Sequence, residues 1–224
     1  MKQRDLYYLQ ELSKREKLCY VNLTQIGECA VAESTNGFCY LQIADKNSKR
    51  FMQGFFEFTG KGTTDEISLP KGYEMRSPDG KIIAKYQYSE PFNIQIGEQG
   101  EFTATFNREE MLFYLKYYLS TWRTEDAKKY MLVFHRDSDC WHLRGYNSTK
   151  KVKLKNMPIN SKDTIQDTTF TFAVNPHTLR LIFKWFEGEN ITLYFHNGNY
   201  ECKTQIFMRE NNKLAVLMPI ARKK

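Results

Sequence analysis

The chain has 224 residues, of which 41% are hydrophobic and 15% aromatic, so it can bury a core and does not have the composition of a disordered protein. No apolar run approaches the ~18 residues of a membrane-spanning helix, and the polar N-terminus lacks the apolar stretch of a signal peptide. The five cysteines show no CxxC spacing, which favours buried thiols in a reducing cytosol over a metal site.

The positive charge is concentrated in the second half of the chain. Residues 1–98 contain 13 Lys and Arg and 13 Asp and Glu, whereas residues 99–224 contain 20 and 13, so the whole net charge of +7 lies there. This asymmetry indicates a polyanionic partner, either nucleic acid or an acidic membrane, or it is the ordinary charge of a basic soluble protein. Charge alone does not separate these interpretations.

The first half reads as one helix followed by strands. Residues 3–16 are predicted to form a helix with Leu6, Leu9 and Leu12 facing inward. The composition of residues 51–70, which is rich in Gly and Thr, disfavours a second helix. The other expected features are strands at 18–24, 28–33 and 38–43, loops at 45–50 and 59–66, a hairpin of 72–77 with 80–88 around an Asp-Gly turn, and a domain boundary within 89–100 with strand character at 92–96.

The second half contains the same strand–helix–strand–strand unit twice. The first copy has a strand at 102–107, a helix from Met111 to Leu119, and strands at 131–135 and 140–146. The second copy has a strand at 170–175, a helix from Leu179 to Phe186, and strands at 191–196 and 200–208. A duplicated unit of this kind predicts an α+β fold of antiparallel sheets with the helices on one face.

Both helices have clear start signals. Asn107 is expected to cap the first helix, with Glu110 completing a capping-box-like pair. Asn175 is expected to cap the second helix, with Pro176 at its first position, and Gly188 is well placed to end it.

On a helical wheel, the second helix separates into three faces. One apolar stripe should face the sheet, a basic stripe should face solvent, and a third apolar face should contact the first helix. These stripes are, in order, Leu179, Ile182, Phe183 and Phe186; His177, Arg180 and Lys184; and Leu181 and Trp185.

Several short segments resemble DNA sliding clamps, and their order and spacing match as well. Residues 186–193 followed by Leu217-Met218-Pro219-Ile220 resemble the C-terminal segment of the bacterial replicative clamp. Residues 143–147 resemble a strand of tailed-phage trimeric clamps, and residues 30–38 resemble a clamp strand and turn. The chain departs from the pattern in three places. It has one helix in residues 1–98 and little or no leading strand. After the terminal Met-Pro, the Arg comes one residue later than in the bacterial Met-Pro-hydrophobic-Arg ending.

The resemblance implies a non-enzymatic, cofactor-free protein that encircles duplex DNA and tethers a DNA polymerase. It implies two clamp-like domains, at 1–92 and 93–224, and a homo-oligomeric ring, with a trimer favoured by the chain length. It also implies the cytosol of a bacterial or phage-infected cell. We assign the DNA-facing surface to basic residues of the helices and of the Lys-rich run at 150–155: Lys14, Arg15, Arg108, Lys116, Arg180, Lys184, Lys151 and Lys153, with Arg4 and Lys17 as weaker candidates. The alternatives are solvated helix faces and, for the lysine run, protection of an edge strand.

In the bacterial clamp, partner proteins insert a short hydrophobic peptide between domains. The resemblance places this pocket at Gly37, Phe38, Tyr40, Met218, Pro219 and Ile220. The alternative for residues 217–220 is a buried last strand with a Pro near its end. The sequence contains no GxxxxGK[ST], GxGxxG, HExxH or GxSxG motif. Two further functions stay open: a DNA-binding accessory factor that does not form a ring, and a protein–protein adaptor that uses the clamp fold without DNA.

Overall fold

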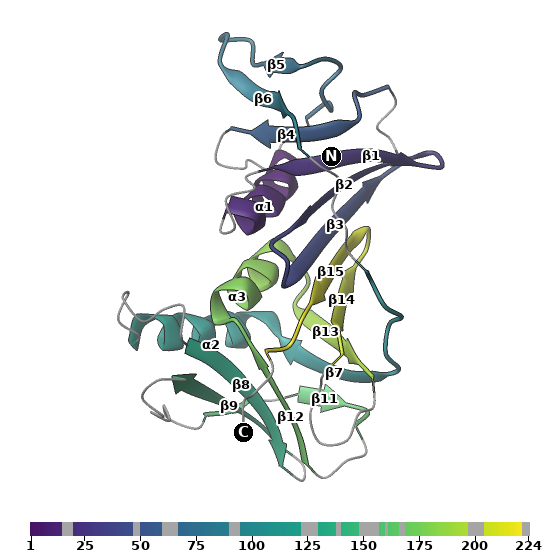
Figure 1. The fold of residues 1–224 in the computed structure, drawn as a ribbon. Helices are drawn as coiled ribbons and strands as arrows, with labels where there is room; N and C mark the ends of the chain where they lie inside the picture. The colour runs from purple at the N-terminus through teal and green to yellow at the C-terminus, as the bar shows by residue number, and fades with distance from the viewer. Residues whose placement is uncertain are drawn as a thin grey trace. The chain divides into compact units, whose positions relative to one another are not determined.

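The computed structural model of this chain divides into two compact units (Figure 1). Unit 1 comprises Met1–Gln95 with Asn211–Ala215, and unit 2 comprises Ile96–Glu210 with Val216–Lys224. The structure describes residues 1–14, 20–46, 50–59, 67–89, 95–121, 130–137, 140–147, 157–159, 161–165, 169–196 and 204–220. Among these residues, no helix is long and apolar enough to cross a membrane.

Unit 1 consists of a helix packed on an antiparallel sheet. Its elements are α1 (Gln3–Lys14), β1 (Val21–Ile26), β2 (Cys29–Thr35), β3 (Cys39–Asp45), β4 (Gly54–Phe58), β5 (Glu74–Arg76) and β6 (Ile82–Gln87). The strand order is β15-β3-β2-β1-β4-β6-β5, with the first residues of β15 (Lys213–Leu217) at one edge. Helix α1 packs on β1 to β4 and buries Leu6, Leu9 and Leu12 completely, which confirms the predicted inward face. The predicted hairpin is the antiparallel pair β5–β6.

Two buried polar side chains attach α1 to the sheet. The amide of Gln10 donates to the carbonyl of Phe58 at 2.6 Å and accepts from its N–H at 2.5 Å, so it pairs with β4 as a strand residue would. The carboxylate of Asp5 lies 2.9 Å from the ammonium of Lys213, and both side chains are buried. Because removing one partner of a buried pair leaves the other uncompensated, these contacts fix the position of α1.

Unit 2 contains the duplicated unit, and its two copies exchange their first strands. The elements are β7 (Phe102–Asn107), α2 (Arg108–Thr121), β8 (Tyr130–Asp137), β9 (Cys140–Asn147), β10 (Met157–Ile159), β11 (Ser161–Asp163), β12 (Thr169–Val174), α3 (Pro176–Trp185), β13 (Asn190–Phe195) and β14 (Ile206–Glu210). One sheet has the order β11-β7-β13-β14-β15, and the other has the order β10-β9-β8-β12. Strand β7 of the first copy therefore pairs with β13 of the second, and β12 of the second pairs with β8 of the first.

A cluster of aromatic rings fills the core of unit 2. Trp141 lies within 6.5 Å, between ring centroids, of five phenylalanine rings contributed by both sheets, and all six side chains are buried. The five are Phe106, Phe134, Phe170, Phe172 and Phe195. The indole N–H of Trp141 donates to Asp163 at 2.7 Å, and Asp163 also pairs with Arg136 at 3.0 Å. Burial of this much aromatic surface is a large part of what holds the two sheets together.

The α+β clamp-like fold predicted from the repeat is confirmed, with local differences. Helix α3 ends at Trp185, and the backbone of Phe186 is extended, so Gly188 lies beyond the helix and does not cap it. Strand β14 begins at Ile206, and most of the earlier part of the predicted strand 200–208 lies outside the described residues. Most of the strand character predicted at 92–96 also lies outside them, and Gln95 and Ile96 are not in a strand.

Candidate functional site

Helices α2 and α3 pack against each other and begin as predicted. The side-chain oxygen of Asn175 accepts hydrogen bonds from the N–H groups of His177 at 2.9 Å and Thr178 at 3.2 Å. That of Asn107 accepts from the N–H of Glu110 at 3.0 Å. The carboxylate of Glu110 accepts from the Tyr114 hydroxyl at 3.3 Å, a contact within α2, whereas the contact of Glu110 with Asn107 is made by its backbone N–H.

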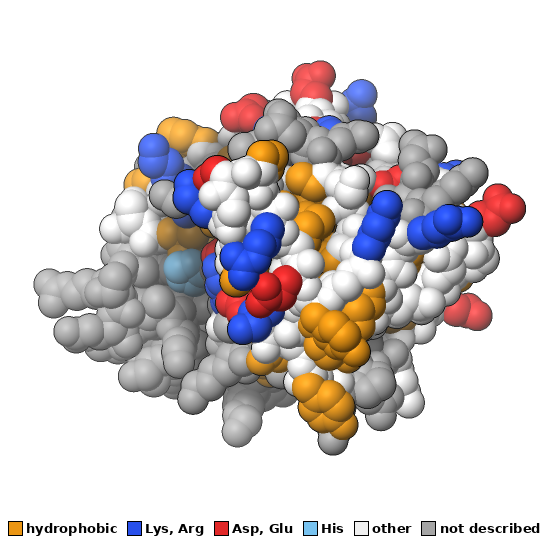
Figure 2. Space-filling view, turned by 90° about the horizontal axis from the view of Figure 1, so that it is seen from above, with side chains coloured by type: hydrophobic (Ala, Val, Ile, Leu, Met, Phe, Trp, Pro, Cys, Tyr) orange, Lys and Arg blue, Asp and Glu red, His pale blue; other side chains and the backbone are white. Residues whose placement is uncertain are grey.

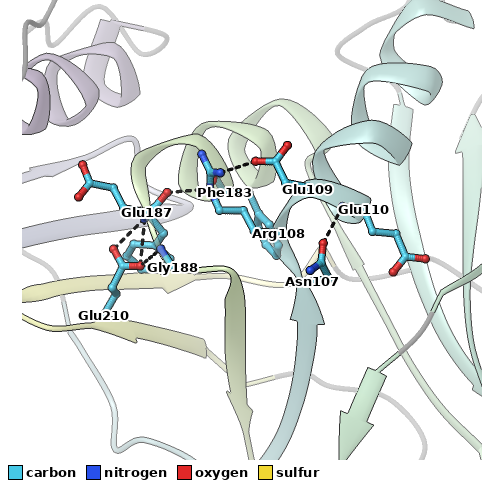
Figure 3. Close-up of polar contacts among 9 residues, drawn as sticks. Asn107, Arg108, Glu109, Glu110, Phe183, Glu187, Gly188 and Glu210 are labelled. Atoms are coloured by element: carbon cyan, nitrogen blue, oxygen red, sulfur yellow. Dashed lines mark hydrogen bonds and ion pairs between the residues drawn. The ribbon is translucent and has the colours of Figure 1, made fainter.

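The side chain of Arg108 joins the start of α2 to the end of α3 (Figure 3). Its Nε donates to the carbonyl of Phe183 at 2.9 Å and to that of Phe186 at 2.8 Å. The last carbonyls of a helix have no partner within the helix and carry partial negative charge, so a guanidinium satisfies them well. Another guanidinium nitrogen lies 2.6 Å from Glu109, and the side chain is only 19% exposed.

Glu210 holds the same turn from the opposite side (Figure 3). Its carboxylate accepts hydrogen bonds from the N–H of Glu187, at 2.9 and 3.0 Å, and from the N–H of Gly188. A Cβ at position 188 would lie 2.8 Å from the Glu210 carboxylate, so any other residue there would displace the Glu210 side chain. Two opposite charges from β14 and α2 therefore fix the turn that leaves α3.

The face of α3 that points away from the core carries the predicted basic residues. Leu179, Ile182, Phe183 and Phe186 are fully buried, which confirms the inward stripe. On the outer side Lys184 is exposed, whereas Arg180 and His177 are half-buried. Desolvation lowers the pKa of Lys184 below its usual value, and the positive charge of Arg180 lowers it further. These two cations are therefore close enough to interact.

The remaining basic residues differ in how far their side chains are exposed to solvent. Lys116 on α2 is exposed. Arg108 was expected to face outward, but its side chain is mostly buried at the junction of α2 and α3. On α1, Lys14 is exposed, pairs with Glu11 at 2.5 Å and lies 5.9 Å from the ring of Tyr7. The other predicted DNA contacts lie outside the described residues: Arg15, Lys17, Lys151 and Lys153. On the face shown in Figure 2, basic and acidic side chains are interspersed, and exposed hydrophobic groups form separate patches.

The predicted pocket residues of unit 1 lie in and beside a rigid turn. The side-chain oxygen of Asn36 accepts from the N–H groups of Phe38 at 3.0 Å and Cys39 at 2.8 Å. The hydroxyl of Thr35 accepts from the N–H of Gly37 at 3.0 Å and donates to the Cys39 carbonyl at 2.9 Å. Gly37 has a φ of +80°, which glycine adopts without strain. The Phe38 side chain at the tip is 66% exposed.

Tyr40 differs from the expectation of a pocket-lining side chain. It is only 5% exposed, and its hydroxyl donates to Glu33 at 2.5 Å. Burial raises its pKa above the usual value, and the Glu33 carboxylate adds to the effect. Its strand position was predicted from sequence, but its burial follows from tertiary packing.

The predicted pocket residues of unit 2 follow strand β15. Met218 is 36% exposed, and Pro219 and Ile220 are half-buried. The N–H of Ile220 donates to the carbonyl of Ala173 in β12 at 2.7 Å, so this segment is attached by its backbone while its side chains remain partly accessible.

Comparison with known structures shows the fold. The chain superposes on DNA polymerase III subunit beta from Pseudomonas aeruginosa with a TM-score of 0.71 at 11% identity, over 99% of this chain and 65% of that one. It superposes on a DNA polymerase sliding clamp from Bacillus subtilis with a TM-score of 0.71 at 11% identity, over 99% of this chain and 61% of that one. It superposes on DNA polymerase III beta subunit from Thermotoga maritima with a TM-score of 0.69 at 12% identity, over 100% of this chain and 65% of that one. This chain thus has a sliding-clamp fold and spans less than two thirds of those chains.

The sequence by itself matches no model of a protein family, and it matches no curated protein. The fold similarity therefore exists with little residue identity. The sequence does not indicate the contacts of Arg108 and Glu210, because their partners are distant along the chain. The partners of Arg108 lie 75 and 78 residues away, and those of Glu210 lie 22 and 23 residues away.

Proposed function

We propose that this protein is a DNA sliding clamp, or clamp-like processivity factor, that encircles duplex DNA as a homo-oligomeric ring and tethers replication proteins. The observation that carries the proposal is the pair of adjacent helices α2 and α3, which display Lys116, Arg180 and Lys184 on a clamp fold. A trimer is favoured by the chain length, and we keep the domain boundary at 92/93 and the phage-like setting in the cytosol as parts of the proposal.

A clamp performs no covalent chemistry, so its residues need only attract and retain DNA. Exposed Lys and Arg side chains attract phosphates at long range and without base readout, which permits sliding. We propose Lys14, Arg15, Lys116, Arg180 and Lys184 as phosphate-facing groups, with Lys151 and Lys153 as further ones. Arg108 is retained only as a residue that positions the two helices, because its guanidinium is already bound to carbonyls.

We further propose that partner proteins dock through a short hydrophobic peptide. The exposed Phe38 ring and the partly exposed Met218–Ile220 segment provide apolar surface of the required kind. Gly37 contributes the turn that presents Phe38, and Tyr40 supports the strand beneath it.

The test compares retention of the protein on nicked circular and on linear duplex DNA after gel filtration. A closed ring persists on circles and slides off free ends. The variant Arg180→Glu with Lys184→Glu should lose retention on circles by at least about tenfold, because two phosphate-attracting charges become repulsive. A charge-matched control is Lys71→Glu with Lys81→Glu, since both lysines are exposed in unit 1, and it should be retained normally. Normal retention of the α3 variant would contradict the assignment.

A second candidate function is favoured by one observation. Unit 1 has a single helix, α1, among its described residues, so it offers less helical surface to a DNA channel than unit 2. This suits a DNA-binding accessory factor that does not close a ring. Such a protein would be retained equally on linear and circular DNA. An adaptor without DNA binding would be retained on neither and would show no dependence on salt.

A further inference from the structure

The outer face of α2 carries aromatic rings where a simple duplex-facing surface would need only charge. Phe113 is 63% exposed and Tyr117 is 39% exposed. They are one turn apart on the same side of the helix, and the exposed Lys116 precedes Tyr117 directly. Large exposed aromatic groups that share one helix face indicate a binding surface.

Each exposed ring is supported by a second, anchored ring. Phe113 lies 5.7 Å, edge to face, from Tyr114, and Tyr117 lies 5.8 Å, edge to face, from Tyr118. The hydroxyl of Tyr114 donates to the Pro158 carbonyl at 3.2 Å, and that of Tyr118 donates to the Leu143 carbonyl at 2.6 Å. The outer rings are therefore held in place by residues that are themselves bonded to β9 and β10.

The charge around these rings suits an anion. The acidic residues of α2 are confined to its first turn, where Glu109 pairs with Arg108 and Glu110 accepts from Tyr114. Lys116 lies beside the rings, and Arg180 and Lys184 lie on the adjacent helix. Aromatic rings interleaved with cations are the surface on which single-stranded nucleic acid binds, since bases stack on the rings and phosphates meet the cations.

We propose that Phe113 and Tyr117 form a platform on which unpaired bases of single-stranded nucleic acid stack, with Lys116 binding the backbone. In a duplex the base faces are already stacked on each other, so such rings gain little from it. Residues four apart in a helix are separated by about 6 Å along its axis. This exceeds the ~3.4 Å rise between stacked bases, so the two rings suit two bases of an extended strand. The proposal goes beyond duplex encirclement and does not require a closed ring.

The test measures binding of fluorescein-labelled (dT)20, (rU)20, a 20-bp duplex and a 20-mer of abasic sites by fluorescence anisotropy, using the full chain. Phe113→Ala with Tyr117→Ala should weaken binding of (dT)20 by about tenfold or more for each ring lost. Wild-type protein should bind the abasic strand about as weakly as the double variant binds (dT)20. Tyr117→Phe keeps the ring and should bind as wild type does, and Tyr88→Ala, which removes a 91% exposed ring in unit 1, is the matched control. The comparison of (dT)20 with (rU)20 shows which strand is preferred.

The outcomes separate this platform from the proposed clamp function. If (dT)20 binds the double alanine variant and wild-type protein equally, with unchanged circular dichroism, the platform is wrong. It is also wrong if the double variant changes only the sedimentation coefficient, since the face would then join copies of the chain. Loss of (dT)20 binding in the double variant supports the platform even if wild-type protein fails to persist on circular DNA. Arg180→Glu with Lys184→Glu should lose circle retention, and it should weaken (dT)20 binding less than the double alanine variant does, because the rings and Lys116 remain.

Discussion

At the scale of single residues, Tyr118 shows how one hydroxyl fixes a helix to a sheet. Its side chain is fully buried, and its hydroxyl donates to the Leu143 carbonyl at 2.6 Å. Burial raises its pKa above the usual value of about 10, and the neighbouring Tyr117 and Tyr114 raise it further. The side chain therefore stays protonated in the folded state at a pH where it ionises in the unfolded chain.

This shift predicts a loss of stability in alkali. A group whose pKa is raised on folding contributes fully below its unfolded pKa, here about 10, and the contribution is lost as pH rises above that value. Tyr118→Phe should lower the free energy of unfolding at pH 8 by about 1 kcal/mol, because one hydrogen bond is lost. It should also lose less stability than wild type between pH 9 and 11.

Urea unfolding at pH 8, 9 and 11 measures both effects. Tyr40→Phe is a useful comparison, since the pKa of Tyr40 is raised by burial and by Glu33 and both variants should therefore reduce the alkaline loss. A pH profile of Tyr118→Phe parallel to that of wild type would show that Tyr118 does not contribute to it.

Residue patterns predicted local contacts well and distant ones poorly. Asn107 and Asn175 cap helices within three residues of themselves, so the rule needs only the adjacent sequence. Arg108 was read as an outward cation because its partners, the carbonyls of Phe183 and Phe186, are brought to it by the fold. The burial of Tyr40 was missed for the same reason.

At the scale of elements, the junction of α2 and α3 is the contact that sets the site. Arg108 supplies hydrogen bonds to the end of α3, its own N–H donates to the Glu189 carbonyl at 2.8 Å, and Glu210 satisfies the following N–H groups. Because the charged partners come from α2 and β14, the direction of α3 depends on both.

We expect Arg108→Ala to destabilise the protein by about 2 kcal/mol, because hydrogen bonds from a charged group are lost and carbonyls are left without it. Arg108→Lys should cost less, since an ammonium keeps the charge but cannot reproduce the fork of the guanidinium. Thermal or urea unfolding of the two variants and wild type measures whether Arg108→Ala loses more stability than Arg108→Lys. If both variants unfold like wild type while duplex binding falls, Arg108 contacts DNA and the positioning role is wrong.

The elements themselves were largely predictable, because their apolar periodicity survives in each copy of the repeat. The exchange of β7 and β12 between copies was not, since strand order in a sheet depends on pairings across the whole unit. The sequence predicts that Gly188 ends a helix, whereas Gly188 lies in the turn beyond α3 and its N–H donates to Glu210, 22 residues later.

At the scale of the whole molecule, the oligomeric state decides between the proposed functions. A trimer should have about three times the mass of the 26.6 kDa chain, measured by light scattering and native mass spectrometry over a range of concentrations. The mass of a monomer at concentrations that support retention on circular DNA would contradict the ring. The Lys71→Glu, Lys81→Glu variant should keep the wild-type mass.

The clamp fold was predictable because short motifs occur in the right order along the chain, even though identity to the solved clamps is only 11–12% in the three cases compared. Subunit number was not, because it depends on surfaces that meet only in an assembly. The platform on α2 was also missed, since Phe113 and Tyr117 are ordinary core residues by type and only the fold exposes them.

The turn from Thr35 to Cys39 has a consequence for the affinity of any peptide that binds there. Two polar side chains already hold its backbone, so the turn that carries Phe38 has little backbone freedom left to lose. A flexible peptide that meets this ring would bear nearly all of the ordering cost itself. Stiffening the peptide, for example by cyclisation, should therefore strengthen such a complex more than any further stiffening of the turn.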